Sequence, residues 1–313
     1  MTAVRRDERA EVFYRSRGRL FGIAYRMLGT RADAEDIVQD AYIRWHNADK
    51  SEIETPEGWL TTVVTRLSID RLRKASVQRE TYIGPWLPEP LLVDKADSPE
   101  MRAELESAVS LAFLVMLERL SPLERAVFLL HDVFDLAHAE IAKVVAKSET
   151  AIRQIVSRAR ARVRSDRSRF EVDAVTRTDL IKKFISASYT GDAQTLMSIF
   201  ADDVSLTSDG GGKVNAAKKI LYGTKRLANL HTVAIRKYPG RLAAYMVTLN
   251  GEPGLIEYAD GVPFAASTFS IEDGRIMALY RMMNPDKLRA FENLEEKLIN
   301  AQVSQRHGDD RHE

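Results

Sequence analysis

The spacing of apolar residues predicts helices in the first quarter of the chain. Two sets of apolar side chains recur every three or four positions: Leu20, Ile23, Ala24, Met27 and Leu28, then Ile37, Val38, Ala41, Tyr42 and Trp45. This spacing keeps each set on one face of a helix. We expect Gly29 to end the first helix and Asp33 to begin the second.

A third helix is predicted from residue 55 to residue 76. Thr55 as N-cap and Pro56 at the first helical position form a common helix start. Its apolar positions share one face: Leu60, Val63, Val64, Leu67 and Leu72. Acidic and basic side chains lie off this face, so they are expected to be exposed.

The segment TYIGPWLPEPLL, from Thr81 to Leu92, breaks the helical pattern. Three prolines within six residues exclude a helix or a central strand. Residues 79–100 are therefore expected to form a linker. A flexible linker is normally polar, whereas this one carries Trp86 and Leu87, which favours a segment that docks on a folded surface.

Helical spacing resumes after Pro99 and includes a helix-turn-helix pattern. The residues Ser121 to Glu124, SPLE, are typical of a capping box at a helix start. Two helices at 138–147 and 148–164 follow, separated by a tight turn. Their inward positions are expected to be Ile141, Ala142, Val145, Ile152, Ile155, Val156 and Ala159. The outward polar residues of the second helix suit the DNA major groove, although a helical hairpin with a solvated basic face has the same pattern.

After Thr176 the chain alternates between helical and strand-like patterns. Helices are predicted at Asp179 to Tyr189 and at Asp192 to Phe200. Short runs of alternating apolar and polar residues follow, and Glu272 to Gly274 is a good hairpin turn. This pattern is typical of an α+β unit with a curved antiparallel sheet. The tail, residues 289–313, is expected to be helical at first and then disordered.

Composition limits the possible chemistry. The chain has 313 residues and no cysteine, which predicts two or three domains without disulfides or zinc–thiolate sites. The six histidines show no spacing that favours a metal, so neither a metal nor a cofactor is expected. No stretch approaches the roughly 18 apolar residues of a membrane helix, and the first residues are not a signal peptide. A cytoplasmic protein without a membrane partner is expected.

Charge is unevenly distributed although the net charge is only +1. Residues 31–57 contain eight acidic and three basic residues, whereas residues 150–170 contain seven arginines and one aspartate. A chain with one acidic and one basic block can bind two partners of opposite charge.

Three stretches resemble a known family. Residues 25–47 and 56–76, YRMLGTRADAEDIVQDAYIRWHN and PEGWLTTVVTRLSIDRLRKAS, are similar to region 2 of extracytoplasmic-function (ECF) sigma factors. Residues 117–164 resemble region 4 of the same family. The motifs WLPEP, DGGGK and NPDKL look like those of the subgroup that carries a fused SnoaL-like domain.

The resemblance implies a multidomain fold. Two all-α sigma domains are expected, a region 2 helical bundle at 8–78 and a region 4 helix-turn-helix at 101–168. A C-terminal α+β SnoaL-like cone, with a cystatin-like curved antiparallel sheet and helices, is expected at 175–288. The implied function is that of an alternative RNA polymerase sigma factor, which directs promoter-specific transcription initiation and is regulated in cis by the SnoaL-like domain.

The resemblance also implies partners and their residues. The β′ clamp helices of core RNA polymerase would meet the acidic second helix, at Asp33, Asp36, Gln39, Asp40 and Trp45. The −10 promoter element would be read and melted by the third helix, at Arg66, Asp70, Arg71, Arg73 and Lys74. The −35 element would meet the last helix of region 4, at Ser148, Glu149, Thr150, Arg153, Gln154, Ser157, Arg158, Arg160 and Arg162. The turn before that helix departs from the family, which usually has Gly and then an apolar residue where this chain has Ala146 and Lys147.

The three motifs are expected to act together in regulation between domains. Their residues are Trp86, Leu87, Pro88, Glu89 and Pro90, then Asp209, Gly210, Gly211, Gly212 and Lys213, then Asn284, Pro285, Asp286, Lys287 and Leu288. We expect Trp86, Leu87 and Leu91 to enter a groove of the SnoaL-like domain and to favour an inactive arrangement. The alternative is that Trp86 packs only on its neighbouring helices.

Other functions remain open from the sequence. The chain could be a SnoaL-like enzyme or ligand sensor with a DNA-binding appendage, with His231, Asp209, Tyr222 and Asp260 as the candidate groups. It could also be a repressor or activator that binds DNA without polymerase. The acidic helix favours the sigma factor, because a repressor needs no surface that grips polymerase. A small-molecule ligand of the SnoaL-like pocket is possible, and its identity cannot be deduced from the sequence.

Overall fold

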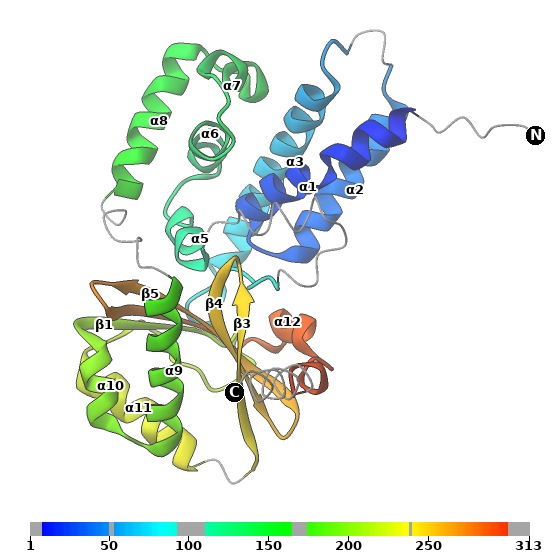
Figure 1. Cartoon of the computed structure of the whole chain (residues 1–313). Helices are drawn as coiled ribbons and strands as arrows, with labels where there is room; N and C mark the ends of the chain where they lie inside the picture. The colour runs from blue at the N-terminus through cyan, green and yellow to red at the C-terminus, as the bar shows by residue number, and fades with distance from the viewer. Residues whose placement is uncertain (1–7, 50–52, 93–109, 165–173, 238–239, 300–313) are drawn as a thin grey trace, which may run out of the picture. The chain divides into compact units, whose positions relative to one another are not determined.

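The structure is a computed structural model that describes residues 8–49, 53–92, 110–164, 174–237 and 240–299 (Figure 1). Its contacts divide the chain into two units. The N-terminal unit comprises Met1–Thr81 and Leu91–Ser168, and the C-terminal unit comprises Tyr82–Pro90 and Arg169–Glu313.

This division separates the expected linker, residues 79–100. Its middle part, Tyr82–Pro90, belongs to the C-terminal unit, whereas Leu91 belongs to the N-terminal unit. Leu91, which we expected to share a groove with Trp86, is thus grouped with the other unit. Residues 93–109, which include the end of the expected linker and the expected start of region 4, lie outside the described residues.

The first three helices are α1 (Glu8–Leu28), α2 (Arg31–Asn47) and α3 (Pro56–Arg79). Gly29 follows α1 in a left-handed conformation (φ 78°), and its N–H donates to the Tyr25 carbonyl at 2.7 Å. Helix α2 begins before Asp33, because Thr30 is its N-cap. The Thr30 hydroxyl accepts from the Asp33 N–H at 3.3 Å, which satisfies one free donor of the first turn.

The apolar faces of these helices form a buried core. Leu60, Val64 and Leu72 of α3 are buried, as predicted, whereas Val63 and Leu67 are only half-buried. Thr61, Thr65, Ser68 and Ile69 are buried as well, so the buried face of α3 is shifted from the face that the apolar spacing predicted.

The described residues of the N-terminal unit contain four more helices: α5 (Leu111–Leu117), α6 (Pro122–Asp132), α7 (His138–Val145) and α8 (Glu149–Arg164). The predicted capping box at the start of α6 is present. The Glu124 N–H donates to the Ser121 hydroxyl at 3.4 Å, and the Ser121 N–H donates to the Glu124 carboxylate at 3.1 Å.

Helices α7 and α8 form the predicted helix-turn-helix. Ala146 in the turn is left-handed, with φ 53° and ψ 52°, which costs a residue with a Cβ roughly 1 kcal/mol. Ser148 caps α8 by accepting the Ala151 N–H at 3.2 Å. The inward residues of α7 are Ile141 and Val144, while the expected Ala142 and Val145 are half-buried, because α7 is rotated by about one position.

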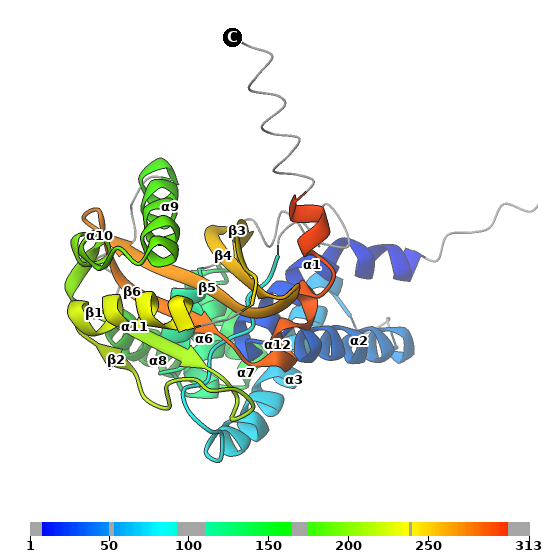
Figure 2. The same cartoon turned by 90° about the horizontal axis from the view of Figure 1, so that it is seen from below.

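The C-terminal unit contains a six-stranded sheet with helices on one face (Figure 1 and Figure 2). Its helices are α9 (Ala174–Thr190), α10 (Ala193–Ile199), α11 (Thr224–Lys237) and α12 (Pro285–Leu288), followed by the 3₁₀ turn η3 (Arg289–Phe291). Its strands are β1 (Phe200–Asp209), β2 (Leu221–Tyr222), β3 (Leu242–Leu249), β4 (Glu252–Ala259), β5 (Val262–Glu272) and β6 (Arg275–Met282). The strand order is β2-β1-β6-β5-β4-β3.

The sheet is not wholly antiparallel, although the sequence predicted an antiparallel sheet. Strands β1 and β6 are paired in parallel, and the other pairs are antiparallel. Parallel neighbours need a long connection, which the chain between β1 and β6 supplies. The predicted hairpin turn joins β5 to β6, where Asp273 (φ 47°) and Gly274 (φ 69°) both adopt positive φ, as in type I′ turns.

The start of the tail belongs to the core of the C-terminal unit. Phe291 is buried, and its carbonyl accepts from the Tyr258 hydroxyl at 2.9 Å. Residues 295–299 are helical, and Glu295 pairs with Arg241 of the loop before β3 at 2.8 Å. The predicted disordered end falls within residues 300–313, outside the described residues.

Candidate functional site

The acidic face of α2, made of Asp36, Gln39 and Asp40, is exposed. These three side chains are available to a partner, as the sequence predicted. Trp45 is not, because it is only 2% exposed and its ring lies 5.6 Å from that of Trp59. The prediction that Trp45 contacts polymerase is therefore corrected, because its side chain packs between α2 and α3.

Asp33 is engaged within the chain. Arg71 of α3 donates to its carboxylate from Nη2 at 2.6 Å and from Nε at 2.9 Å. Arg71 also lies 3.5 Å from Asp36, and the hydrogen bond and negative charge of Asp33 raise the pKa of Arg71. The structure thus brings together residues that the sequence assigned to two different partners.

The polar residues of α3 are exposed, as predicted, and one of them contacts the helix-turn-helix. Asp70, Arg73 and Lys74 face solvent, with Arg73 paired to Asp70 at 3.1 Å. Arg66 donates from Nε to the Val144 carbonyl at 2.8 Å. It donates from Nη2 to the Lys143 carbonyl at 3.2 Å, so it caps the C-terminal end of α7.

Helix α8 presents a recognition face of five exposed residues: Thr150, Arg153, Gln154, Ser157 and Arg158. Ser148 and Glu149 are exposed beside them, and Glu149 pairs with Arg153 at 2.5 Å. Arg160 and Arg162, which were also expected to meet the −35 element, are paired within the chain. Arg160 pairs with Asp132 at 2.9 Å and Arg162 with Glu124 at 2.6 Å, so both contact α6.

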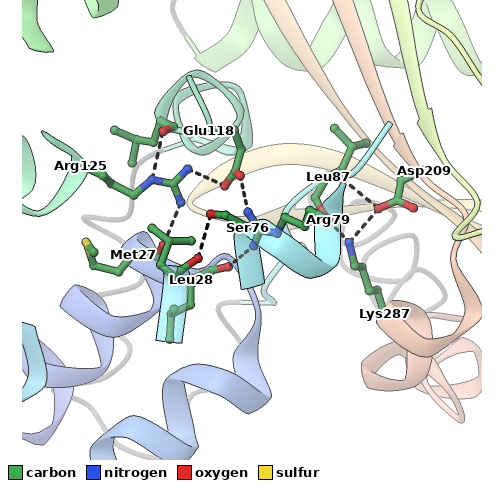
Figure 3. Close-up of polar contacts among 11 residues, drawn as sticks. Met27, Leu28, Ser76, Arg79, Leu87, Glu118, Arg125, Asp209 and Lys287 are labelled. Atoms are coloured by element: carbon green, nitrogen blue, oxygen red, sulfur yellow. Dashed lines mark hydrogen bonds and ion pairs between the residues drawn. The ribbon is translucent and has the colours of Figure 1, made fainter. Parts of the chain in front are cut away.

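In the C-terminal unit the three motifs meet around the buried Asp209, which is 0% exposed (Figure 3). One carboxylate oxygen accepts from the Leu87 N–H at 2.9 Å and from the Lys287 ammonium at 2.7 Å. The other accepts from the Tyr82 hydroxyl at 2.6 Å and from the Gly211 N–H at 3.1 Å. We call these residues, with Trp86 and Asn284, the motif cluster.

The cluster holds the Pro-rich segment by both polar and aromatic contacts. Lys287 also donates to the Leu87 carbonyl at 2.5 Å, and its ammonium lies 4.2 Å from the centroid of the Trp86 ring. Asn284 donates to the Tyr82 hydroxyl at 2.9 Å. Burial and hydrogen bonding to Asp209 raise the pKa of Tyr82, so its hydroxyl stays protonated at neutral pH.

The glycines of DGGGK allow a turn and a close approach. Gly211 and Gly212 have φ 60° and φ 72°. A Cβ at Gly211 would lie 2.4 Å from the Asn284 amide nitrogen, and one at Gly212 would lie 2.8 Å from Ile83. Within the same motifs Gly210, Pro88, Pro90 and Leu288 are buried, Glu89 is half-buried and Pro285 is exposed. Lys213 pairs with Asp286 at the surface.

An arginine cluster in the N-terminal unit was not expected from the sequence (Figure 3). Arg125 of α6 is 2% exposed and donates to the carbonyls of Met27 at 2.8 Å and Leu117 at 3.0 Å. It pairs with Glu118 at 2.7 Å. Arg79 of α3 also pairs with Glu118, and it donates to the Leu28 carbonyl at 2.9 Å. The last carbonyls of a helix lack partners within the helix, and here Arg79 and Arg125 donate to those of Leu28 and Met27.

The candidate groups for catalysis are dispersed. Asp209 is committed to the motif cluster, and Tyr222 is exposed. Asp260 accepts the Arg241 N–H at 2.8 Å. His231 is buried and packs edge-on against Phe184, with ring centroids 4.9 Å apart. Across the described ranges, no three His, Asp or Glu side chains gather as a metal site would require, and no helix is long and apolar enough to cross a membrane.

Comparison with known families defines the class of protein. The model of sigma-70 region 2 matches residues 13–77, and that of sigma-70 region 4 matches residues 110–163. These stretches contain the α1–α3 core and the helix-turn-helix. The two helical domains therefore define a sigma-70-type transcription factor.

Whole-chain similarities narrow the class. The ECF RNA polymerase sigma factor SigJ of Mycobacterium tuberculosis is 38% identical over 285 residues, which cover 87% of this chain and 90% of SigJ. The probable ECF RNA polymerase sigma factor SigI of that species is 31% identical over 282 residues, covering 88% and 93%. The crystal structure of SigJ matches with a TM-score of 0.72 at 34% identity, covering 89% of this chain and 97% of SigJ.

The chain belongs to the ECF RNA polymerase sigma factors, which direct promoter-specific initiation of transcription. The predicted family, fold and general function are confirmed. The match to SigJ includes the helix-and-sheet unit that follows the two sigma domains. These relatives are sigma factors rather than enzymes.

Proposed function

We propose that this sigma factor binds the β′ clamp helices of core RNA polymerase through the acidic face of α2. The −10 element would meet the basic side of α3, and the −35 element the recognition face of α8. This division of roles is supported by the exposure of Asp36, Gln39 and Asp40 and by the row of polar residues on α8. Because a sigma factor acts on promoter DNA, we expect this protein to be located in the cytoplasm.

A core-binding titration tests the first of these roles. Asp36→Arg with Asp40→Arg should weaken binding to purified core polymerase by about 1–3 kcal/mol, because it reverses charge at the interface. The double change Asp202→Arg with Asp203→Arg is a matched control, since both aspartates are exposed in the C-terminal unit. Because Asp36 also pairs with Arg71, Asp40→Arg alone should still show part of the loss. Equal affinities for the variant and the control would contradict the assignment.

We further propose that the C-terminal unit regulates the factor in cis by holding the chain between regions 2 and 4. The strongest support is that the Asp209 carboxylate accepts four hydrogen bonds. Two of them hold Tyr82 and Leu87 inside the C-terminal unit. These contacts withdraw nine residues, Tyr82–Pro90, from the connection. Extended, nine residues would span about 30 Å.

The contacts between regions 2 and 4 support a closed resting form. Arg66 joins α3 to α7, and Arg79 and Arg125 join α1 and α3 to α5 and α6. The −10 and −35 elements lie about 25 base pairs apart, or roughly 85 Å at 3.4 Å per base pair. Because direct hydrogen bonds connect regions 2 and 4, the two regions must separate before they can reach the −10 and −35 elements together. Release of Tyr82–Pro90 would therefore favour the active form.

In vitro transcription with purified core polymerase tests this regulation. Asp209→Asn removes the charge that pairs with Lys287, and it should raise promoter output at a fixed concentration of factor. Lys225→Ala is the control, because Lys225 is exposed on α11 and belongs to none of the three motifs. Output from Asp209→Asn that equals the control and the unchanged chain would rule out regulation through the motif cluster.

A further inference from the structure

Arg66 of α3 is assigned to one partner by the sequence and contacts another in the structure. By resemblance to the family it is one of the residues that would meet the −10 element. In the structure its guanidinium donates to backbone carbonyls of α7, from Nε to Val144 at 2.8 Å and from Nη2 to Lys143 at 3.2 Å. A phosphate group is bound by the same kind of paired N–H donors. A phosphate at this position would therefore have to replace the α7 carbonyls.

The end of α7 shows why it takes donors from another helix. Ala146 in the turn is left-handed (φ 53°), and the N–H groups of Ala146 and Lys147 both donate to the Ala142 carbonyl. In a continuing α-helix the Lys147 N–H would donate to the Lys143 carbonyl instead. The last carbonyls of a helix then depend on side chains or water. Arg66 satisfies two of them, and its positive charge suits the negative end of the helix dipole.

The contact between Arg66 and α7 is accessible to DNA. Arg66 is exposed, whereas Arg125, which also joins the two regions, is only 2% exposed. A phosphate carries a full negative charge, while the C-terminal end of a helix carries about half of one. Hydrogen bonds to an ionised acceptor are also shorter and stronger than those to a neutral one. A phosphate is therefore the stronger of the two partners of Arg66.

The neighbours of Arg66 on α3 form a path that leads to this contact. Asp70, Arg73 and Lys74 follow Arg66 at helical spacing, so the four residues share one face of α3, and all four are exposed. The single acidic residue, Asp70, pairs with Arg73 at 3.1 Å. At 1.5 Å per residue this face extends about 12 Å from Arg66 to Lys74. A DNA strand that follows the face therefore reaches the contact between Arg66 and α7.

We propose that α7 and the backbone of −10 DNA compete for Arg66, so that DNA bound along α3 releases the helix-turn-helix from region 2. The ligand is the phosphate backbone of an unpaired strand, since α3 is the helix assigned to melted DNA. This inference rests on the proposed −10 role of α3. It goes beyond that role, because it makes DNA itself a ligand that shifts the closed form towards the open one.

Spin labels on α3 and α7 of the full-length chain test this competition. The chain has no cysteine, and Val77→Cys with Ala139→Cys places labels at exposed positions of the two helices. Double electron–electron resonance should give one distance distribution without DNA. A saturating amount of a short single-stranded oligonucleotide of mixed sequence should add a longer component. Fluorescence anisotropy of a labelled oligonucleotide measures its binding in the same buffer.

The outcomes separate the competition from the function on which it rests. An unchanged distance distribution with the oligonucleotide bound would overturn the competition and leave the −10 role of α3 intact. An oligonucleotide that does not bind at all would remove the −10 role of α3, and the competition with it.

A matched pair of variants separates the two partners of Arg66. Arg66→Ala removes an exposed arginine that contacts α7, and Arg73→Ala removes one that pairs with Asp70 on its own helix. Each change removes one phosphate contact. Both should therefore flatten the slope of log binding constant against log salt concentration by about 0.7. Only Arg66→Ala should show the longer distance before DNA is added, and circular dichroism melting checks that both variants fold.

Each of these two readouts can contradict the proposal. If Arg66→Ala and Arg73→Ala give the same distance distribution without DNA, the Arg66 contact does not hold α7 to α3. If Arg66→Ala leaves the salt dependence unchanged while Arg73→Ala flattens it, Arg66 does not bind DNA. The −10 role of α3 would then stand without the competition.

Discussion

At the residue scale, buried polar side chains have different roles in the two units. Arg125 and Asp209 both satisfy several backbone groups, and each joins stretches of chain that are distant in sequence. His231 instead remains neutral in an apolar surrounding, with Nε2 unpartnered among the described residues. Its titration therefore reports on the folding of the C-terminal unit.

His231 should make the stability of the C-terminal unit depend on pH. Its pKa is lowered from 6.5 to about 3, so the unfolded chain takes up a proton before the folded chain does. The stability that the neutral form contributes is complete above about pH 6.5 and is lost as pH falls towards 3. The slope is at most about 1.4 kcal/mol per pH unit.

Urea denaturation at pH 7, 6 and 5 measures this effect. The unchanged chain should lose stability over this range, and His231→Gln should lose less. His46→Gln is the control, because His46 is exposed on α2. A His231→Gln chain whose pH dependence matches that of the control would show that His231 is not kept neutral by burial.

At the element scale, the recognition face of α8 predicts a difference between two arginines. Arg153 is exposed at the centre of this face, so Arg153→Ala should cost about 1–3 kcal/mol at the preferred −35 sequence and relax base preference there. Arg162 already pairs with Glu124, so a phosphate contact must compete with that carboxylate. Arg162→Ala should therefore weaken all sequences slightly and alike, with a flatter salt dependence.

Binding titrations of both variants against a promoter library at several salt concentrations separate the two effects. If α8 reads bases through its recognition face, only Arg153→Ala shows losses that depend on the sequence. The same profile for both variants across sequences and salt would mean that α8 reads DNA through another face.

The short elements that follow β6 are part of the fold. Truncation after Leu288 removes Phe291 and Glu295, and loss of a buried Phe side chain costs about 3–5 kcal/mol. We expect this chain to have a less stable C-terminal unit and a higher transcription output. Truncation after Ile299 is the control, because it keeps every described residue of the tail. If both truncations transcribe like the full chain, the tail has no part in regulation.

Local sequence signals predict most of the elements but few of the long-range contacts. The capping box at Ser121 and the hairpin turn at Asp273 depend on neighbouring residues, so their sequence is sufficient to predict them. The parallel pairing of β1 with β6 depends on strands about 70 residues apart, and no local pattern encodes it. The assignment of Trp45 is wrong because an apolar residue at helical spacing can face either a core or a partner.

The site predictions show the same limit. The motifs around Asp209 are recognisable by resemblance, and the structure adds that one carboxylate joins them. The apolar character of residues 81–92 predicts that the ring of Tyr82 is packed. It does not predict that the Tyr82 hydroxyl donates to Asp209. The arginine cluster could not be predicted. Arg125 lies in a helix, and the neighbouring residues in the sequence do not distinguish a buried arginine from an exposed one.

At the scale of the whole molecule, regulation in cis requires that regions 2 and 4 stay together while the motif cluster holds Tyr82–Pro90. The contacts of Arg66, Arg79 and Arg125 favour this form, and the anchored segment adds to them. Loss of the anchor should shift the population towards separated regions rather than unfold either one. The chain has no cysteine, so two spin labels can be introduced without removing native thiols.

The distance between α3 and α8 in solution tests this requirement most directly. Val77→Cys and Ala161→Cys place labels at exposed positions of these helices. Double electron–electron resonance should give one narrow distance distribution for the otherwise unchanged chain and an additional, longer component when Asp209→Asn is added. A broad distribution in the unchanged chain, or identical distributions in both, would contradict regulation by the held segment.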